Sequence, residues 1–520
     1  MMDLPQRSSG ILLHPTSLPG LYGIGTLGVH AYRFVDFLVQ SGQSLWQILP
    51  LGPVDSDGSP YSSFCSAAGN PLLISLGQLV EHGDLNSSDL STSPFPPDAR
   101  FVDYAALDHW KTQILQQAVQ RFVQSGSAAR KAAFDEFRSR ESDWLEDYAL
   151  FMALKTHYDR QTAGPDHGQA TWNRDWDQDI ALRQPAALAW WRERLRDRVE
   201  YHCVLQYFFF EQWGALKRYA NDRGIAIIGD MPIFVALNSV DVWCHPNLFQ
   251  LDEERREIFV AGVPPDYFSA TGQRWGNPLY NWDAMAANGF DWWIRRFDHL
   301  LKLVDIVRID HFRGFAACWA IPSEEEIATN GQWVRVPGYD LFETVQQGLG
   351  HLPFLAEDLG VITPDVEELR DHFGFPGMRV LQVGFENIDS ENIHLPDNHV
   401  ENSVVYTGTH DNNTTVGWYQ SLPARQQQAI AEFFGGELQD PAWEMIRVAM
   451  ASVARYAVIP MQDVLRLDQS ARMNTPSTKS GNWRWRLQHD HDGQTVSAQL
   501  AQLTAEHQRT AQPDGTAPTR

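Results

Sequence analysis

The sequence predicts an α/β fold, a (β/α)8 TIM barrel with large inserted subdomains. Eight short apolar runs have helical segments between most of them, and several of the runs end in an acidic residue. Runs rich in leucine and β-branched residues are typical of buried parallel strands, and acids at the carboxyl ends of successive strands are typical of barrel active sites. The chain has 520 residues, which is long for one compact domain and favours a barrel with insertions.

The first predicted elements form a βαβ unit. The run GILLHPT at 10–16 leads through a Pro/Gly loop to an amphipathic segment at 29–41, and LWQILP at 45–50 follows. The alternation then stops between about 78 and 200, where segments such as DHWKTQILQQAVQRFV have helical spacing. We therefore expect an inserted, mainly helical subdomain at 78–200.

The alternation resumes with a helix near 201–222 and the run IAIIGD at 225–230. A segment rich in Gly, Pro and aromatic residues at 236–285 predicts a second insertion, an inserted loop subdomain. The remaining predicted strands are VDIVRID, PFLAED, MRVLQVGF, VVYTGTHD and YAVIPMQD. The predicted division gives 1–77, 201–235 and 286–504 to the barrel, 78–200 and 236–285 to insertions, and 505–520 to a disordered tail.

Composition excludes several classes of function. The net charge of −24 disfavours nucleic acid and anionic membranes as partners, so a neutral substrate suits the chain better. The four cysteines are far apart and have no metal-ligand spacing, so we expect no disulfide framework, no metal and no cofactor, and a cytoplasmic location. No signal peptide and no stretch of about 18 apolar residues is present, so we expect no membrane span.

One motif points to a different class of protein. Residues 23–28 read GIGTLG, which matches the GxGxxG pattern of dinucleotide-binding folds. In those folds the first glycine directly follows the strand, whereas here the segment 14–20 intervenes and the next strand ends in Leu49 and Pro50 rather than in an acid. We interpret the motif as a tight turn that packs a helix start against a strand.

Asp310 is the first candidate catalytic acid. It lies two residues after Arg308 on a predicted strand, so the two side chains share one side of that strand. A guanidinium so close favours the ionised carboxylate, which is what a nucleophile needs. The alternative is a structural ion pair at a strand end.

Glu357 is the second candidate. It follows Phe354, Leu355 and Ala356 and precedes Asp358. An apolar setting or a neighbouring anion raises the pKa of a glutamate and suits it to act as a general acid. Either Glu357 or Asp358 could face the barrel axis, and their spacing does not decide between them.

Two further acids follow predicted strands. Asp411 lies between His410 and Asn412, and all three can bond sugar hydroxyls; the alternative for Asp411 is a helix N-cap. Asp230 ends another apolar run. Cleavage of a glycoside with retention needs two carboxyl groups about 5 Å apart and a group that grips the oxocarbenium-like sugar, so these acids supply enough candidates.

Aromatic residues in polar loops point to a sugar substrate. The segment GVPPDYFSATGQRWGNPLYNW contains Trp275 together with Asp266, and Tyr61 lies in another Gly/Pro-rich loop. Flat apolar faces beside hydroxyl-bonding groups are what pyranose rings stack on. We expect residues 262–276 to form an active-site lid.

Several of these segments together resemble one known family. LLHPTSLPG, YGIGTLG, SPYSSF, GDMPIFVA, GVPPDYFSATGQRWGNPLYNW, VRIDHFRGF, AEDLG and YTGTHDNNT are similar to the signature segments of amylomaltase, also called 4-α-glucanotransferase or disproportionating enzyme. They run in family order across about 10–490 and resemble the short bacterial type. The family belongs to the α-amylase clan, so the resemblance also implies a (β/α)8 barrel.

The resemblance implies a role for each candidate acid and a reaction. It implies Asp310 as nucleophile, Glu357 as acid/base and Asp411 as transition-state stabiliser. It implies transfer of α-1,4-glucan segments between maltooligosaccharides, with glucose or an oligosaccharide as acceptor. The implied sugar contacts are Tyr61, Asp230, Asp266, Trp275, Arg308, His311, His410 and Asn474.

Two other functions are compatible with these acids. One is an α-glucan hydrolase of the same clan, and the other is an inactive glucan-binding protein, which we would expect to have lost at least one of the three acids. The chain also departs from the family at one point. The family's loop before SPY commonly carries a tyrosine, but here it reads GPVDSDGSPY with Ser56 in that region. We therefore do not expect the remote glucan-binding site described for some members.

Overall fold

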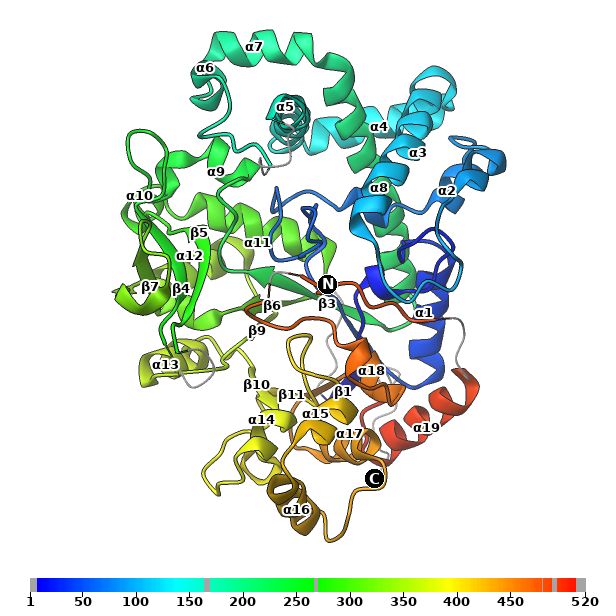
Figure 1. Cartoon of the computed structure of the whole chain (residues 1–520), viewed down its shortest axis with the longest axis vertical. Helices are drawn as coiled ribbons and strands as arrows, with labels where there is room; N and C mark the ends of the chain where they lie inside the picture. The colour runs from blue at the N-terminus through cyan, green and yellow to red at the C-terminus, as the bar shows by residue number, and fades with distance from the viewer. Residues whose placement is uncertain (1–6, 163–168, 266–269, 479, 489–492, 511–520) are drawn as a thin grey trace, which may run out of the picture.

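The computed structural model describes residues 7–162, 169–265, 270–478, 480–488 and 493–510 (Figure 1). Within these ranges eight parallel strands close into a barrel in the order β1-β12-β11-β10-β9-β6-β3-β2. They are β1 (Ser8–Leu12), β2 (Leu45–Gln47), β3 (Ala226–Pro232), β6 (Ile306–Asp310), β9 (Phe354–Ala356), β10 (Gly377–Val380), β11 (Ser403–Tyr406) and β12 (Tyr456–Pro460). The predicted barrel is confirmed, and each predicted strand overlaps one of these eight.

The barrel strands are buried because helices cover them. All residues of β1, β11 and β12 are buried, as the apolar runs predicted for a parallel sheet. One boundary was predicted wrongly: the run MRVLQVGF is strand only to Val380, and α14 (Leu381–Glu386) begins at once. A continuous apolar run does not distinguish a strand from a buried helical turn, so the sequence gives no signal for this change.

Amphipathic helices surround the barrel. On α1 (Val29–Gln40) the buried residues Ala31, Phe34, Val35 and Leu38 recur at the spacing of one helix face. The other helices of this layer are α8 (Arg196–Asn221), α11 (Asp291–Leu303), α12 (Gly338–Leu349), α13 (Pro364–His372), α15 (Thr415–Ser421), α16 (Ala424–Phe433), α17 (Pro441–Ala451), α18 (Met461–Val464) and α19 (Gly493–Glu506). None of the described helices is long and apolar enough to cross a membrane.

Further helices occupy the chain between β2 and α8. Figure 1 shows α5, α6 and α7 at one end of the molecule, away from the barrel strands. The helices are α2 (Leu76–Glu81), α3 (Tyr104–Ser125), α4 (Ala128–Arg140), α5 (Leu145–Thr162), α6 (Gln178–Ala181) and α7 (Pro185–Arg194). Their positions agree with the helical spacing of this segment, while the division of the chain into separate subdomains stays a prediction.

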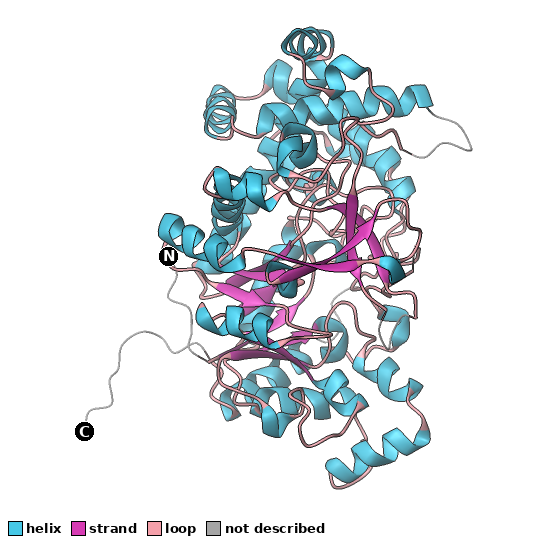
Figure 2. Ribbon diagram, turned by 90° about the vertical axis from the view of Figure 1, so that its left-hand side faces the viewer, coloured by secondary structure: helices cyan, strands magenta, loops and turns pink. Residues whose placement is uncertain are grey.

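A second, antiparallel sheet lies to one side of the barrel (Figures 1 and 2). Its order is β5-β4-β7-β8. The strands are β4 (Phe259–Val263), β5 (Gln273–Pro278), β7 (Ala317–Pro322) and β8 (Gln332–Arg335), and α9 (Val240–Cys244) and α10 (Trp282–Ala287) flank the first two. We expected a loop subdomain here. The sequence of β5, QRWGNP, lacks strand composition, and its pairing with β4 overrides that preference, whereas the run FVAGV of β4 is strand-like.

The GIGTLG segment forms a turn between β1 and α1. Gly25 donates its N–H to the Thr16 carbonyl at 2.9 Å, and a Cβ at this position would collide with the backbone of Pro15 and Leu18. The close approach of two backbones accounts for the glycine. This agrees with our interpretation of the motif as a packed turn.

The prediction of a disordered tail from residue 505 is wrong for residues 505–510. Helix α19 continues to Glu506, and Arg509 is fully buried. Its guanidinium donates to the carbonyls of Met450 at 2.8 Å, Ser8 at 3.0 Å and Ser452 at 2.7 Å. The polar composition of this segment predicted disorder, because it does not show that one arginine binds backbone carbonyls. Residues 511–520 lie outside the described residues.

Candidate active site

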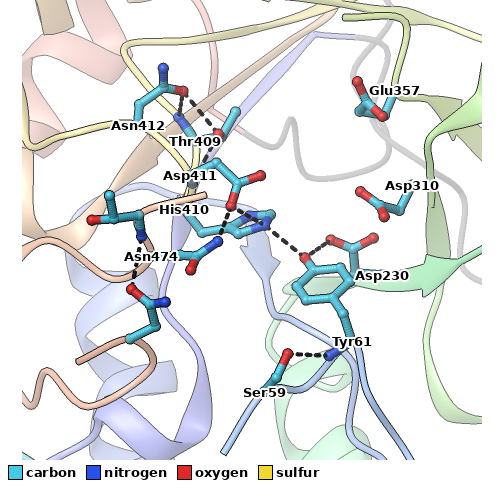
Figure 3. A network of polar contacts seen from close by, with 12 residues as sticks. Ser59, Tyr61, Asp230, Asp310, Glu357, Thr409, His410, Asp411, Asn412 and Asn474 are labelled. Atoms are coloured by element: carbon cyan, nitrogen blue, oxygen red, sulfur yellow. Dashed lines mark hydrogen bonds and ion pairs between the residues drawn. The ribbon is translucent and has the colours of Figure 1, made fainter. Parts of the chain in front are cut away.

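Four acids and their partners gather at the carboxyl ends of the barrel strands (Figure 3). Asp310 is the last residue of β6, Glu357 follows β9, Asp230 lies near the end of β3, and Asp411 lies in the loop after β11. Figure 3 shows Asp310, Glu357 and Asp411 facing one common space. Parallel strands bring these four segments to one end of the barrel, although up to 181 positions separate them in the sequence.

Arg308 connects two of the acids. Its Nη1 donates to both oxygens of Asp230 at 2.8 and 2.7 Å and to Oδ1 of Asp310 at 3.0 Å. The geometry follows from the sheet, because Arg308 is paired with Asp230 on the neighbouring strand β3 and shares one side of β6 with Asp310. The side chains of Arg308 and Asp230 are 3% and 0% exposed, so each charge depends on the other for compensation.

Asp310 has an elevated pKa. Burial raises the pKa of Asp310 to about 6, the Arg308 guanidinium opposes this rise, and the anions of Asp230 and Asp411 add to it. The guanidinium favours the ionised carboxylate, as predicted, but the effect of burial on the pKa is larger. The ionised form still predominates at pH 7.

Glu357 has the higher pKa of the two. Burial raises the pKa of Glu357 to about 8, with Arg308 opposing the rise and Asp310 adding to it. The backbone N–H groups of His311 and Leu359 donate to its two oxygens at 2.6 and 2.9 Å and hold the carboxyl in place. At pH 7 the protonated form predominates, so one site holds an ionised and a protonated carboxyl group.

The structure decides between Glu357 and Asp358. Asp358 points away from the site, where it pairs with Arg370 and accepts the N–H of Met378 at 2.6 Å. Glu357 faces the site and is close enough to Arg308 and Asp310 for its pKa to respond to both. Asp358 therefore makes an ion pair outside the site, and Glu357 is the residue that faces it.

His311 occupies a strained turn between the two carboxyl groups. Its φ is 53°, in the left-handed region that non-glycine residues rarely adopt. This conformation directs its N–H to Glu357, and its ring packs edge-on against Trp275 with ring centroids 4.7 Å apart. Burial lowers the pKa of His311 to about 3, so the ring is neutral. Trp275 itself is 39% exposed on β5.

Asp411 is held by a different set of contacts. Asn474 Nδ2 donates to its Oδ1 at 2.6 Å, and Arg472 Nη2 donates to its backbone carbonyl at 2.7 Å. The Asp411 side chain is 44% exposed, far more than Asp230. It is not a helix N-cap, because Thr414 caps α15. Asp411 is thus available to a ligand.

Tyr61 connects the two sides of the site. Its hydroxyl donates to Asp230 Oδ2 at 2.8 Å and lies 2.9 Å from Nε2 of His410. Since the single hydroxyl proton goes to Asp230, His410 must donate its Nε2 proton to Tyr61. The two rings also stack with centroids 5.2 Å apart.

The structure brings together most of the predicted site residues. Asp266 lies outside the described residues. Sequence analysis missed Trp483, whose ring centroid lies 5.6 Å from that of Tyr61, because it lies far from any predicted strand. Asp463 was also not identified as a site residue, although it ends the predicted strand YAVIPMQD as the other acids end theirs. Among the described residues, no group of three or more His, Cys, Asp or Glu could hold a metal ion.

The fold and the site together define a class of protein. A parallel barrel with two adjoining carboxyl groups of unequal pKa at the carboxyl ends of its strands is typical of barrel enzymes that cleave glycosidic bonds. The chain matches the model of the 4-alpha-glucanotransferase family over residues 13–492, and it belongs to this family. The resemblance drawn from the sequence segments is confirmed.

Individual relatives match over nearly their whole length. A 4-alpha-glucanotransferase of Thermus thermophilus is 50% identical over 94% of this chain and 95% of its own. One of Synechocystis sp. is 49% identical over 96% of this chain and 98% of its own. The structure of amylomaltase from Streptococcus agalactiae in complex with acarbose superimposes with a TM-score of 0.91 at 40% identity, covering 97% of this chain and all of that one.

Proposed function

We propose that this chain is a retaining 4-alpha-glucanotransferase that moves α-1,4-glucan segments between maltooligosaccharides. The observation that carries the proposal is the pair formed by Asp310 and Glu357 at the carboxyl ends of the neighbouring strands β6 and β9, with the pKa of Glu357 raised further than that of Asp310. Retaining glycoside chemistry needs a nucleophilic carboxylate beside a carboxylic acid. The curated relatives named above bear the same activity in their names.

The reaction proceeds in two displacements. Glu357 gives its proton to the glycosidic oxygen while the Asp310 carboxylate attacks the anomeric carbon, so the bond to the leaving glucan breaks and a glycosyl ester forms. Glu357, now ionised, takes the proton of the 4-hydroxyl of the acceptor. That oxygen attacks the anomeric carbon, the ester bond to Asp310 breaks, and the second inversion restores the α configuration.

The surrounding side chains bind the sugar and stabilise it as it becomes oxocarbenium-like in the transition state. Asp411 faces the space beside Asp310, and with His410 it bonds the ring hydroxyls more tightly as the sugar flattens. The Arg308 guanidinium opposes protonation of Asp310. Further contacts to the glucan are assigned to Tyr61, Asp230, Asp266, Trp275, Arg308, His311 and Asn474.

Trp275 excludes water from the second displacement. Its ring covers one edge of His311, beside the turn that holds Glu357, and an apolar surface there favours a sugar over water as acceptor. Replacing Trp275 by Ala should raise hydrolysis relative to transfer. Trp190, exposed on α7 in the helical segment, is the matched control for loss of a surface tryptophan. An unchanged ratio in the Trp275 variant contradicts this role.

The substrate range follows from the charge. A chain with net charge −24 suits neutral α-1,4-glucans and uses glucose or an oligosaccharide as acceptor, with no nucleic acid partner. We place the enzyme in the cytoplasm, in keeping with its unpaired cysteines. The chemistry needs no metal and no cofactor, since both proton transfers and the nucleophile come from carboxyl groups.

Incubation with maltotriose tests the proposal. Transfer gives glucose and longer oligomers while the number of reducing ends stays constant. A steady rise in reducing ends would instead identify an α-glucan hydrolase. Binding of maltotriose without any product would identify an inactive glucan-binding protein, and either of these outcomes overturns the proposal.

A further inference from the structure

The loop between β11 and α15 carries His410 and Asp411. Within the loop, the Asn412 side chain accepts the N–H and the hydroxyl of Thr409, both at 2.9 Å. These contacts shape the tip of the loop but do not attach it to the barrel. Besides the contacts of Asp411 with Asn474 and Arg472, the loop is attached through the two threonines at its ends, Thr407 and Thr415.

Asp463 holds both ends of this loop. It lies in α18, directly after β12, and is 1% exposed. Its Oδ2 accepts the hydroxyls of Thr407 at 2.5 Å and of Thr415 at 2.7 Å, and its Oδ1 accepts the N–H of Thr415 at 2.7 Å. A single buried carboxylate therefore joins the first and last residues of the segment that presents Asp411.

The contacts of Asp463 require an acceptor at both oxygens. Three groups donate to it: the hydroxyls of Thr407 and Thr415 and the N–H of Thr415. None of them belongs to a lysine or an arginine. An amide in its place would present an N–H₂ group either to the backbone N–H of Thr415 or to the two hydroxyls. The first arrangement sets donor against donor, and the second forces both hydroxyls to turn.

Gln382 holds the loop from its other side. This residue is the second of α14, which follows β10, and it is 1% exposed. Its Nε2 donates to the Asn413 carbonyl at 2.9 Å, and its N–H donates to the Thr407 carbonyl at 3.1 Å. The fit is close, because a Cβ on Gly408 would collide with the Gln382 amide. The helices that follow the two neighbours of β11, α14 after β10 and α18 after β12, thus each contribute one buried residue that holds the loop.

We propose that Asp463 is a positioning residue for the transfer reaction: through Thr407 and Thr415 it sets where His410 and Asp411 stand relative to Asp310. The proposal rests on the function proposed above, in which Asp411 stabilises the transition state. Asp463 itself touches no reacting atom. It acts because misplacing a catalytic group by about 1 Å can cost on the order of 100-fold in rate.

The substitution Asp463→Asn tests the proposal in the full-length enzyme. We expect kcat for maltotriose disproportionation to fall about 100-fold while KM changes by no more than about 3-fold, since the interaction lost is one made in the transition state. Thr415→Val, which removes one hydroxyl, should produce the same kind of change to a smaller extent. Thr415→Ser keeps that hydroxyl and should restore kcat.

Asp305→Asn is the control for loss of a hydrogen-bonded carboxylate away from the site; the Asp305 side chain is 11% exposed and lies 3.4 Å from Lys217. Asp305 accepts the N–H of Ile227 and the amide of Asn221, both at 2.8 Å, at the amino end of the barrel. It should lower the thermal midpoint without the fall in kcat. An equal fall in kcat for Asp305→Asn and Asp463→Asn at matched stability would show a purely structural effect and overturn the proposal.

A second pair of variants separates this proposal from the function on which it rests. Asp463→Asn should cost much less in an Asp411→Asn background than alone, because both act through Asp411. If Asp411→Asn retains full activity, the proposed role of Asp411 fails. If Asp411→Asn is inactive but Asp463→Asn is as active as the parent, the positioning role alone fails.

Discussion

Two buried arginines at opposite ends of the barrel show what the same side chain does with different partners. At the carboxyl end, Arg308 contacts the carboxylates of Asp230 and Asp310. At the amino end, Arg509 donates to backbone carbonyls, among them that of Ser8 at the start of β1. Both guanidinium groups are almost completely buried, so the difference lies in what faces them.

The partners of each guanidinium group decide whether its charge affects the acids of the site or stabilises the fold. Burial lowers the pKa of Arg308, but Asp230 and Asp310 more than reverse this and hold it well above its ordinary value. Burial lowers the pKa of Arg509 to about 9, with the Arg7 cation adding to the effect, and among the described residues no carboxylate is bonded to it. At the carboxyl end, the charge of Arg308 lowers the pKa of Asp310. At the amino end, Arg509 donates hydrogen bonds to backbone carbonyls. We therefore expect substitutions to alter activity at one end and stability at the other.

Asp310→Asn should give the largest effect. It removes the attacking oxygen while keeping the shape of the side chain, so transfer from maltotriose should fall by at least about 10⁴-fold. The fall is measured as initial glucose release, and maltotriose binding by calorimetry shows that the site survives. Retained activity would remove Asp310 from the role of nucleophile.

The pH profile of kcat/KM should be a bell shaped by the two carboxyl groups. Asp310 must be ionised, so activity falls as pH drops through about 6; Glu357 must be protonated, so activity falls as pH rises through about 8. Glu357→Gln should cost about 10³-fold with maltotriose. With α-maltosyl fluoride, whose leaving group needs no proton, the first step should be nearly restored and the basic limb should disappear.

An exposed glutamate provides the control for that experiment. Glu367→Gln on α13 removes a carboxylate from the surface and should leave both limbs unchanged. A basic limb that persists in Glu357→Gln would assign it to another group.

Arg308→Lys should have an intermediate effect. Lysine keeps the charge but not the guanidinium geometry that reaches both Asp230 and Asp310, so we expect a loss of about 10-fold to 100-fold in kcat/KM. A lysine should oppose the effect of burial on Asp310 less strongly than Arg308 does. The pKa of Asp310 should therefore rise, and the acidic limb of the profile should move to higher pH. An unmoved acidic limb would show that burial and the other anions alone set this pKa.

Much of the barrel was predictable because its strands have a simple signature. Each parallel strand is buried, so apolar runs such as that of β12 stand out, and strand ends are marked by a change to charged residues. The second sheet gives no such signal. Its strand β5 contains Gln273, Arg274 and Gly276, and only its pairing with β4 makes it a strand.

The sequence predicted which residues belong to the site better than it predicted which way their side chains point. Strand-end acids could be found by position, but the choice between Glu357 and Asp358 depends on the turn at His311 and on Arg370. The rise in the pKa of Asp310 was not predicted, because the sequence shows the neighbouring arginine and not the depth of burial. Such features come from contacts between distant segments, which local patterns do not encode.

Arg509→Met tests the other half of the comparison. The variant leaves the carbonyls of Met450, Ser8 and Ser452 without this donor, so the free energy of unfolding should fall by about 3 kcal/mol. Because the amino end lies opposite the site, kcat and both limbs of the pH profile should stay unchanged. Urea unfolding and maltotriose kinetics measure the two effects.

Arg425→Met is the matched control, since Arg425 is exposed on α16 and should change neither quantity. A fall in kcat for Arg509→Met at temperatures well below unfolding would mean that the amino end also sets the geometry of the carboxyl groups. In that case the division between an end for chemistry and an end for stability would fail. A loss confined to stability, with Arg308→Lys moving the acidic limb, would establish that partners rather than burial determine what a buried arginine does.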